Sequence, residues 1–569
     1  MSMWGNIVSR LKEIIRNMIG SRTIQNELHV SYAISPKMES SIQEWSNLYL
    51  NKAPWLHEPT DENPTRIVSL GLPAMIASEK ARTALLELES EITTPTEEVE
   101  VPNPDYQSEP DFVMGADGEQ IPLPTKPQPE TIMEERPVGD TSRAEYLESQ
   151  YKKLKKQLRK QIEYGIAKGG LVIKPYVVMN KTVNENGDDA DSDLEPTVEI
   201  EFDYIQADAF YPLAFNASGM ITEAAFVQSK VERNQIYRKL EYHKWENNTV
   251  TVINKAYKSN NLRSTGEIDN ADLGEEISLS EVPEWKDIEP KAVVKNVTKP
   301  LFAYFKMPEA NTIDPSSPLG VSGFSRAISL IKDADMQYSR LLWEYEAGEM
   351  AIDIDRDALR PDVDSNGNVT SKPNQLQQRL YRKLDLGSDS DTYYPYAPGL
   401  RDTNYISGLN TILMRIEDVC GISRGTLSDS ADVARTATEL KILKQRSYQT
   451  NADIQQAIED AIKDVIYIMN VYSTLYEITP EGEYDVNFEW DDSIMVDINE
   501  EINKRITLMT NGLVSKLENR MWYFGETERQ AAEALAKIDD ENRQSQESDL
   551  MMQYELNNRS NQQNRGNQQ

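Results

Sequence analysis

The sequence predicts an α+β fold, mainly helical, that is divided among several domains. Long stretches keep the three-to-four-residue apolar spacing of amphipathic helices, whereas residues 171–257 alternate with a period of two. Residues 431–479 contain neither glycine nor proline, which predicts one helix of roughly 70 Å at ~1.5 Å per residue. A rod of that length suits an assembly that carries structure from one tier to another better than it suits a globular enzyme. The 569 residues leave room for roughly three to four domains.

Composition narrows the function classes. The formal net charge is −34, which argues against a protein that holds nucleic acid statically, because such proteins present basic faces to the phosphates. Cys420 is the only cysteine, so an intramolecular disulfide is excluded and a reducing compartment is expected. No apolar run approaches the ~20 residues that a membrane-spanning helix needs.

The first 92 residues read as helical. Residues 1–19 have an apolar helical face, which predicts a core or subunit-docking helix or, less favoured, a membrane-surface helix. Charged and apolar residues are interleaved there, so it is not a signal peptide. Met38, Ile42, Trp45 and Tyr49 keep helical spacing, and a further helix is expected from near Pro73 to about Ile92.

Residues 93–140 are rich in proline and acidic residues, with only Lys126 and Arg136 as bases. This composition predicts an extended, self-repelling insertion or linker. A helix is expected from Ser142 to Gly169, with a basic run at residues 152–160. That run is a nucleic-acid patch or a solvated face that pairs with acidic neighbours; the acidity of the chain favours the second interpretation.

An antiparallel β region follows the helix. Period-two alternation predicts strands at Leu171–Met179, Val198–Ile205, Met220–Val231, Tyr237–Glu246 and Thr249–Tyr257, with turns at Asn184–Asp193 and Asn247-Asn248. Residues 258–290 read as a polar, acidic connection, and Leu301–Lys306 as a strand.

Helices dominate the remainder. A helix at 322–348 leads through a strand at 350–354 into a turn-rich unit at 355–400, and a second helix at 404–420 leads into a polar loop and the long rod. A strand at 484–490 and helices near 497–511 and 526–545 come next. Beyond residue 547 the Gln, Asn, Arg and Ser composition predicts a disordered tail.

The chemical motifs do not predict an enzyme. Gly421-Ile422-Ser423-Arg424-Gly425 matches the G-x-S-x-G nucleophile elbow, but the preceding segment is helical and every histidine (His29, His57, His243) lies upstream. Residues 362–367 resemble half of a calcium loop, but Pro373 stands where the bidentate Glu belongs. The pairs Asp353/Asp355 and Asp491/Asp492 are explained by a strand and a helix start. No phosphate-binding G-x-x-x-x-G-K-[ST] motif and no Cys/His zinc cluster occurs.

Several segments together resemble one family, the portal proteins of tailed bacteriophages. The similarity is to the siphophage and prophage kind from Gram-positive hosts, also called phage minor capsid protein. It spans roughly residues 140–545, and the order of the segments is more specific than any one of them. The segments are 301–308 with 311 and 317–322, 343–346, 425–429 with 434–439, 488–493, 512–516 and 522–527.

The resemblance implies a multi-domain portal fold that assembles into a ring with a central channel. The expected parts are a wing (1–320, with the insertion 93–140), stem helix one (321–348), a clip (349–403), stem helix two (404–422), a tunnel loop (423–433), a long wing-spanning helix and strand (434–496), crown helices (497–545) and a tail (546–569). The residues expected at the DNA channel are Ser423, Arg424, Gly425, Thr426, Leu427, Ser428, Asp429, Ser430 and Arg435. For Arg424 and Arg435, transient phosphate contacts and bridges between subunits stay equally open.

The implied function is a non-enzymatic DNA channel at the unique capsid vertex, used for packaging, retention and ejection. The implied partners are further copies in a homododecamer, double-stranded DNA in transit, the terminase large subunit, the major capsid protein, a scaffolding protein and a head–tail adaptor. No cofactor, metal, catalytic residue or membrane is expected. The expected locations are the virion and, during assembly, the host cytoplasm. The alternatives are a nuclease or motor subunit, and a capsid scaffold or adaptor without a pore.

Overall fold

The computed structural model of the chain contains two compact units, residues 1–490 and 491–569. The structure describes residues 27–28, 33–56, 66–86, 88–102, 112–114, 120–122, 131–180, 197–232, 235–259, 273–355, 365–367, 381–384, 393–429, 437–490 and 498–538. The predictions for residues 1–19, for the turn at 184–193 and for the tail lie outside these residues. Among the helices described, none is long and apolar enough to cross a membrane.

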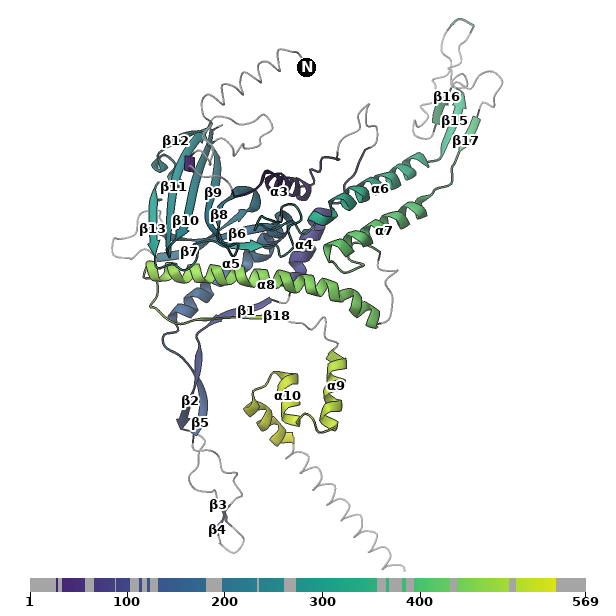
Figure 1. Ribbon diagram of the computed structural model, residues 1–569. Coiled ribbons are helices and arrows are strands. Elements are labelled where there is room, and N and C mark those ends of the chain that lie inside the picture. The colour runs from purple at the N-terminus through teal and green to yellow at the C-terminus, as the bar shows by residue number, and fades with distance from the viewer. Residues whose placement is uncertain are drawn as a thin grey trace, which may run out of the picture. The chain divides into compact units, whose positions relative to one another are not determined.

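Helix α5 (Ser142–Lys168) lies at the centre of the first unit. Its buried residues Leu147, Tyr151, Leu154, Leu158 and Ile162 follow one another every three or four positions, as predicted. It ends at Gly169, whose φ of 87° and close approach to Gly320 both require glycine: a Cβ on Gly169 would lie 2.7 Å from the Gly320 carbonyl oxygen. The shorter helices α3 (Pro36–Tyr49) and α4 (Leu72–Leu85) pack beside it (Figure 1).

The β region forms two antiparallel sheets. The larger has the order β12-β11-β10-β9-β8, with β13 also paired to β11, and the smaller has the order β14-β6-β7. The strands are β6 (Gly170–Asn180), β7 (Thr197–Gln206), β8 (Phe210–Phe215), β9 (Ile221–Glu232), β10 (Gln235–Glu246), β11 (Thr249–Ser259), β12 (Glu275–Ile277), β13 (Lys291–Lys295) and β14 (Ala303–Lys306). The predicted turn at Asn247-Asn248 is confirmed, with φ of 52° and 55° at the two residues.

The predicted end of the second helix, near Ile92, is wrong. Helix α4 stops at Leu85, and residues 88–93 form strand β1 (Leu88–Thr93). Its partner is β18 (Asp485–Trp490), with Ile92 opposite Val486 and Ser90 opposite Phe488. The strand forms because that partner, almost four hundred residues away, supplies its hydrogen bonds, and no local pattern contains that information.

The segment 93–140, predicted as an extended, self-repelling insertion or linker, contains paired strands where the structure describes it. Strand β2 (Thr96–Pro102) pairs in antiparallel register with β5 (Thr131–Pro137), and β3 (Phe112–Met114) pairs with β4 (Gln120–Pro122). Pro102 and Pro137 are terminal residues of their strands, where a missing N–H costs little. The segment is extended, as predicted, and its strands β2 and β5 form backbone hydrogen bonds with each other.

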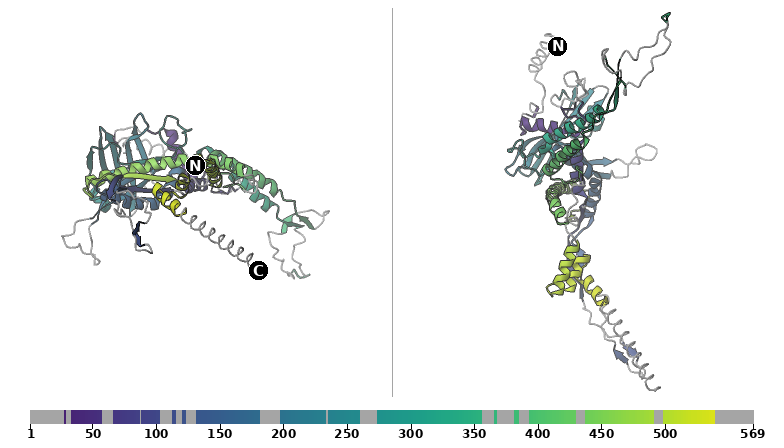
Figure 2. Two further views of the ribbon diagram at one scale, coloured as in Figure 1. Left: turned by 90° about the horizontal axis from the view of Figure 1, so that it is seen from below. Right: turned by 90° about the vertical axis from the view of Figure 1, so that its right-hand side faces the viewer.

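Helices α6 (Ile328–Ala347) and α7 (Asp402–Cys420) lie side by side (Figure 2). The predicted helix start at 321–322 is wrong, because the Gly323 N–H donates to the Ile166 carbonyl of α5 and a 3₁₀ turn at Ser325–Ala327 comes first. Between the two helices, β15 (Ala351–Asp355) is parallel to β16 (Tyr381–Leu384) and antiparallel to β17 (Tyr393–Tyr396).

The predicted rod is helix α8 (Ala437–Leu475), whose 39 residues span about 58 Å at ~1.5 Å per residue. Ile454, Ile458, Ile462, Val465 and Met469 bury one face of it against the core. It ends before the predicted Thr479, since Glu477 adopts a φ of 51°. The buried Arg143 of α5 holds this exit by donating to the carbonyl oxygens of Thr479 (2.8 Å) and Pro480 (3.0 Å).

The second unit contains α9 (Ile498–Thr510), α10 (Lys516–Phe524) and a helix described over residues 528–538. The first and third were predicted near 497–511 and 526–545. Helix α10 was not, although Ser515 and Glu518 form a reciprocal capping box at its start. Its nine residues are too few for a clear apolar period.

Candidate functional site

The turn after α7 contains most of the predicted loop residues. Gly421 ends α7 with a φ of 69°, and a Cβ there would lie 2.4 Å from the Thr450 hydroxyl oxygen of α8. The turn therefore starts where α7 and α8 are in direct contact. Residues 423–429 are described, whereas Ser430 and Arg435 lie outside the described residues.

A buried carboxylate holds this turn. Glu417, on the last turn of α7, has no exposed surface. Its carboxylate oxygens accept the backbone N–H of Leu427 (2.6 Å), the backbone N–H of Ser428 (2.8 Å) and the Ser428 hydroxyl (2.7 Å). Three donors offset much of the cost of burying the carboxylate. The loop is thereby clamped to the helix that precedes it.

The turn also closes on itself. Gly425, with a φ of 87°, donates its backbone N–H to the Ser428 hydroxyl oxygen at 3.2 Å. The Thr426 hydroxyl donates to the Ser423 carbonyl at 2.7 Å. At the far end, the Asp429 N–H donates to the side-chain oxygen of Asn410 at 2.7 Å. Ser423 follows a helix, so the strand-to-helix geometry of a nucleophile elbow is absent from this turn.

Arg424 pairs within its own chain. Its Nε and one terminal nitrogen donate to the two carboxylate oxygens of Asp418 at 3.0 and 2.8 Å. The hydrogen bond with Asp418 raises the pKa of the guanidinium, so Arg424 stays charged. Its side chain remains 37% exposed, which leaves room for a further anionic contact. The predicted residues 423–429 are thus brought together, and their anchors are Asn410, Glu417 and Asp418.

Those three anchors were missed by the sequence analysis. Asn410 and Glu417 stand seven positions apart, which places them on one face of α7 directly ahead of the loop. A polar pair on that face, with Asn410 in the middle of α7 and Glu417 in its last turn, is the signal that could have identified them.

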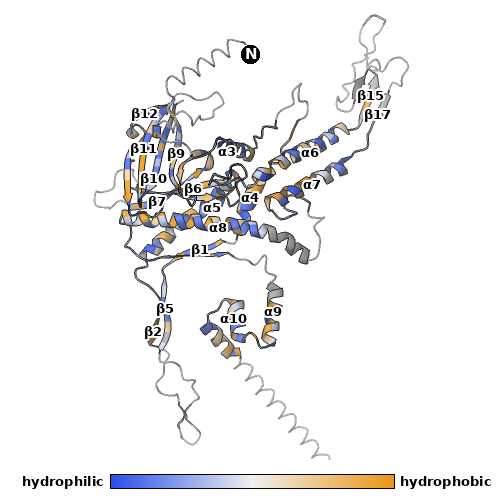
Figure 3. Cartoon of the chain, in the orientation of Figure 1, coloured by the Kyte–Doolittle hydropathy of each residue, from blue (hydrophilic) through white to orange (hydrophobic). Residues whose placement is uncertain are grey.

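The helix pair that carries the turn exposes several large apolar side chains. Figure 3 shows hydrophobic and hydrophilic residues alternating along α6 and α7. Exposed large apolar residues on the two helices and beside them are Trp343, Tyr345, Met350, Leu400, Ile406 and Val419. At the outer end the two helices are tied by Arg401, which donates to both carboxylate oxygens of Glu344 at 3.1 and 2.7 Å. So many exposed apolar side chains on one narrow helix pair are typical of a protein interface.

Comparison with known families identifies the chain. A family model described as "Phage portal protein, SPP1 Gp6-like" matches residues 29–548. The chain belongs to this family of phage portal proteins. A comparison with curated proteins finds no significant match. Family membership implies a capsid-associated homo-oligomer at the portal vertex of the virion, and portal proteins are generally structural rather than enzymatic.

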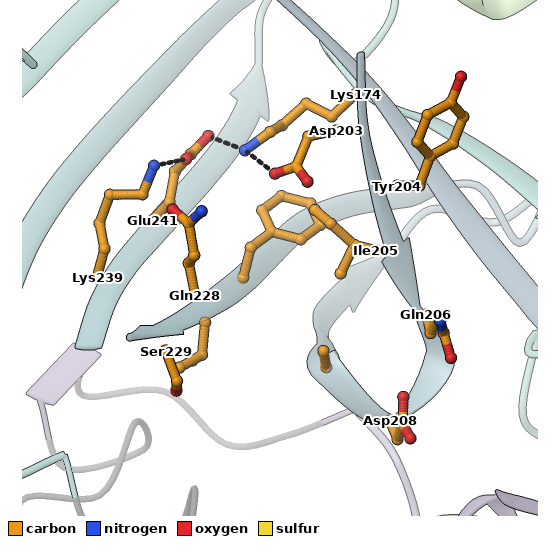
Figure 4. A pocket seen from close by; sticks show the side chains of 13 residues that line it. Lys174, Asp203, Tyr204, Ile205, Gln206, Asp208, Gln228, Ser229, Lys239 and Glu241 are labelled. Carbon is orange, nitrogen blue, oxygen red and sulfur yellow. Dashed lines mark hydrogen bonds and ion pairs between the residues drawn. The ribbon is translucent and has the colours of Figure 1, made fainter. Parts of the chain in front are cut away.

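The portal chain also contains a cavity of about 300 Å³ between its two sheets (Figure 4). Lys174 of β6 lies between Glu241 of β10 (2.7 Å) and Asp203 of β7 (3.7 Å). Glu241 also contacts Lys239 (3.3 Å) and the ring Nε2 of His243 (2.7 Å). Opposite charges therefore meet inside the cavity wall.

This charged cluster joins the two sheets. Burial by itself would raise the pKa of the Glu241 carboxyl, but Lys174, His243 and Lys239 hold it well below its usual value. Burial lowers the pKa of His243, so the ring is neutral at neutral pH. Within the described part of the chain, no group of three or more His, Cys, Asp or Glu side chains could hold a metal ion. The arrangement ties β6 to β10 and shows no catalytic geometry.

Proposed function

We propose that copies of this portal protein form a dodecameric ring whose channel passes double-stranded DNA at the unique capsid vertex during packaging, retention and ejection. The observation that carries the proposal is the turn at 423–429, clamped by Glu417 between the end of the α6/α7 helix pair and α8. A loop that meets moving DNA needs a rigid base, and three hydrogen bonds to one buried carboxylate supply it.

We assign the parts of the ring from the layout that the portal family implies. Residues 1–320 form the wing, α6 and α7 the stem, residues 349–403 the clip, α8 the wing-spanning rod and residues 497–545 the crown. In support, β15, β16 and β17 form a small separate sheet between the two stem helices along the chain. The clip binds the terminase large subunit during packaging and the head–tail adaptor afterwards, and the wing and crown contact the major capsid protein and the scaffolding protein.

The charge of the chain suits a conduit. A net charge of −34 per copy repels the phosphate backbone and keeps the duplex centred. Strong phosphate binding would slow the DNA, because every contact must be broken as the duplex advances. Arg424 and Arg435 then make weak, repeated phosphate contacts or bridge neighbouring subunits. In the single chain Arg424 pairs with Asp418. In either role the Arg424 guanidinium must therefore leave Asp418 or contact a second anion at the same time.

Electron microscopy of the purified protein tests the ring. We expect rings with a central hole and twelve-fold symmetry, and no Mg²⁺-dependent DNA cleavage or ATP turnover. Monomers or filaments would contradict the proposal and favour a scaffold or adaptor without a pore. Cleavage or turnover would favour a nuclease or motor subunit.

The loop is tested by deletion of residues 425–430. Since this deletion removes the donors of Glu417, it is made together with Glu417→Ala, and Glu417→Ala with an intact loop is the matched control. We expect rings from both variants, a partial loss of DNA-filled particles from Glu417→Ala, whose loop has lost its rigid base, and a larger loss from the deletion. Normal DNA-filled particles from the deletion variant would refute the assignment of the loop.

A further inference from the structure

The β2–β5 pair, here called the acidic ribbon, carries charges that have no partner among the residues that the structure describes. Glu97, Glu98 and Glu100 of β2 are exposed and form no hydrogen bond or ion pair with any residue that the structure describes. The base on the ribbon, Arg136, pairs with Glu134 at 3.0 Å. No side chain described on either strand is buried. Figure 1 shows the ribbon as a two-stranded element, and such elements are marginally stable by themselves.

One face of the acidic ribbon is suited to a cationic partner. Glu98 and Glu100 point to the same side of β2, about 6.8 Å apart at ~3.4 Å per residue. Met133, which is 56% exposed, lies opposite Glu100 in the register and shares that side. The face therefore combines two free carboxylates with an exposed apolar side chain.

Helix α5 has the complementary surface. Some of its basic run is used within the chain: Lys153 pairs with Glu199 at 3.1 Å, and Lys155 donates to the Ser90 carbonyl at 2.9 Å. Lys156, Arg159 and Lys160 are exposed and have no ion-pair or hydrogen-bond partner among the described residues. We call these three the α5 basic face. Their spacing puts them on one side of the helix, where positions four apart are ~5–6 Å from each other.

We propose that the acidic ribbon of one copy docks on the α5 basic face of the neighbouring copy in the ring. The two carboxylates on the ribbon match the spacing of Lys156 and Lys160 to within about 1–2 Å. Each copy offers one surface of each kind, so the contact is head-to-tail and closes when the copies form a ring. This inference rests on the proposed ring and assigns an interface within it.

Disulfide trapping between two variants, each with one added cysteine, tests the contact. One chain carries Glu98→Cys and the other Arg159→Cys. The native Cys420 is buried, and burial raises the pKa of its thiol to about 12, so it does not compete. After mild oxidation of the mixture, we expect a band of twice the chain mass on a non-reducing gel. Glu98→Cys mixed with Lys291→Cys, an exposed site on β13, is the matched control and should give no such band.

Charge reversal gives the second measurement. Glu98→Lys with Glu100→Lys should make rings dissociate at lower salt, and adding Lys156→Glu with Lys160→Glu should restore the wild-type dissociation point. If the wild type forms no rings, the proposed function fails first. If wild-type rings form but neither the disulfide nor the salt effect appears, only this contact is refuted. It is also refuted if reversal at α5 leaves rings unchanged and abolishes DNA retention, which would make the α5 basic face a DNA contact.

Discussion

The buried carboxylate of Glu417 accepts a hydrogen bond from the Ser428 hydroxyl at 2.7 Å, and this bond joins two residues eleven positions apart in the sequence. The acceptor lies on the last turn of a helix and the donor lies in the loop that follows. Two backbone N–H groups reach the same carboxylate. A polar loop that would otherwise sample many conformations is held in one, and this single relationship connects helix α7 to the predicted site.

Glu417→Ala should destabilise the chain, because it leaves the Leu427 and Ser428 donors without an acceptor. Each unmade hydrogen bond to a buried group costs about 1–3 kcal/mol. The change in unfolding free energy from chemical denaturation measures the effect. Glu346→Ala on the neighbouring α6, where the side chain is exposed, should change that free energy by less than about 0.5 kcal/mol. Equal effects of the two variants would argue against the clamp.

Gly421→Ala should cost more stability than Gly71→Ala. The two glycines have almost the same φ, 69° and 70°, so the backbone strain of about 1 kcal/mol is common to both. Only Gly421 faces a neighbour, the Thr450 hydroxyl, whereas nothing lies within 4 Å of a Cβ on Gly71. The difference between the melting temperatures of the two variants measures the effect of the contact with Thr450, because the backbone strain is common to both. A Gly71→Ala variant that loses as much stability would contradict the close contact of α7 with α8.

Trp343→Ala should weaken self-association and leave the fold of each copy intact. The indole is 63% exposed on α6, so truncation removes little from the core. A buried Trp at an interface centre contributes about 2 kcal/mol or more, which is roughly a thirtyfold change in affinity. Sedimentation velocity over a concentration series measures it. Leu513→Ala, at an even more exposed site in the second unit, is the comparison; unchanged association of the Trp343 variant would remove this face from the interface.

Lys174→Met should move acid unfolding to higher pH. Lys174 helps to keep the pKa of Glu241 below its unfolded value, so the stability linked to Glu241 is present above the unfolded pKa of about 4.3 and is lost as the pH falls through the folded pKa. Removing the cation raises the folded pKa, and the loss therefore starts at higher pH. Circular dichroism during acid titration gives the midpoint. Lys239→Met, at the longer 3.3 Å contact, should shift the midpoint less.

Arg424→Ala should reduce the amount of DNA retained in particles and change stability by less than about 1 kcal/mol. The pair with Asp418 is partly exposed, and such pairs contribute little to folding. Arg424→Lys keeps the charge and should retain part of the function if phosphate contact is the role. Retention by both variants at the wild-type level would leave Arg424 with only its contact to Asp418.

Much of the fold was predictable from local pattern. The buried positions of α5, the period of two in β9, β10 and β11, and the absence of helix breakers in α8 are each properties of a short window of sequence. The pairing of β1 with β18 and of β2 with β5 was not predicted, although the strand at 484–490 was, because a short window of sequence does not show which distant segment a strand pairs with. Helix α10 was not predicted because its nine residues are too few to show the repeated apolar spacing of a helix.

The predicted site likewise has a part that local pattern predicted and a part that it did not. The order of elements placed a polar loop between α7 and α8, and residues 423–429 do form one compact turn. Their anchors, Asn410 and Glu417, were not predicted, since a carboxylate on a helix is ordinarily solvated and only the folded-back loop makes this one buried.

The sequence by itself determined the mainly helical α+β class, the positions of α5, α7 and α8 and the acidic charge, because each depends on residue type and local spacing. Its resemblance to the portal family rests on the order of several short segments. Only the tertiary structure decided that Glu417 holds Ser428, that β1 meets β18, and that the acidic segment is a paired ribbon. Those features depend on which distant groups satisfy one another's hydrogen bonds, and that is determined when the whole chain packs.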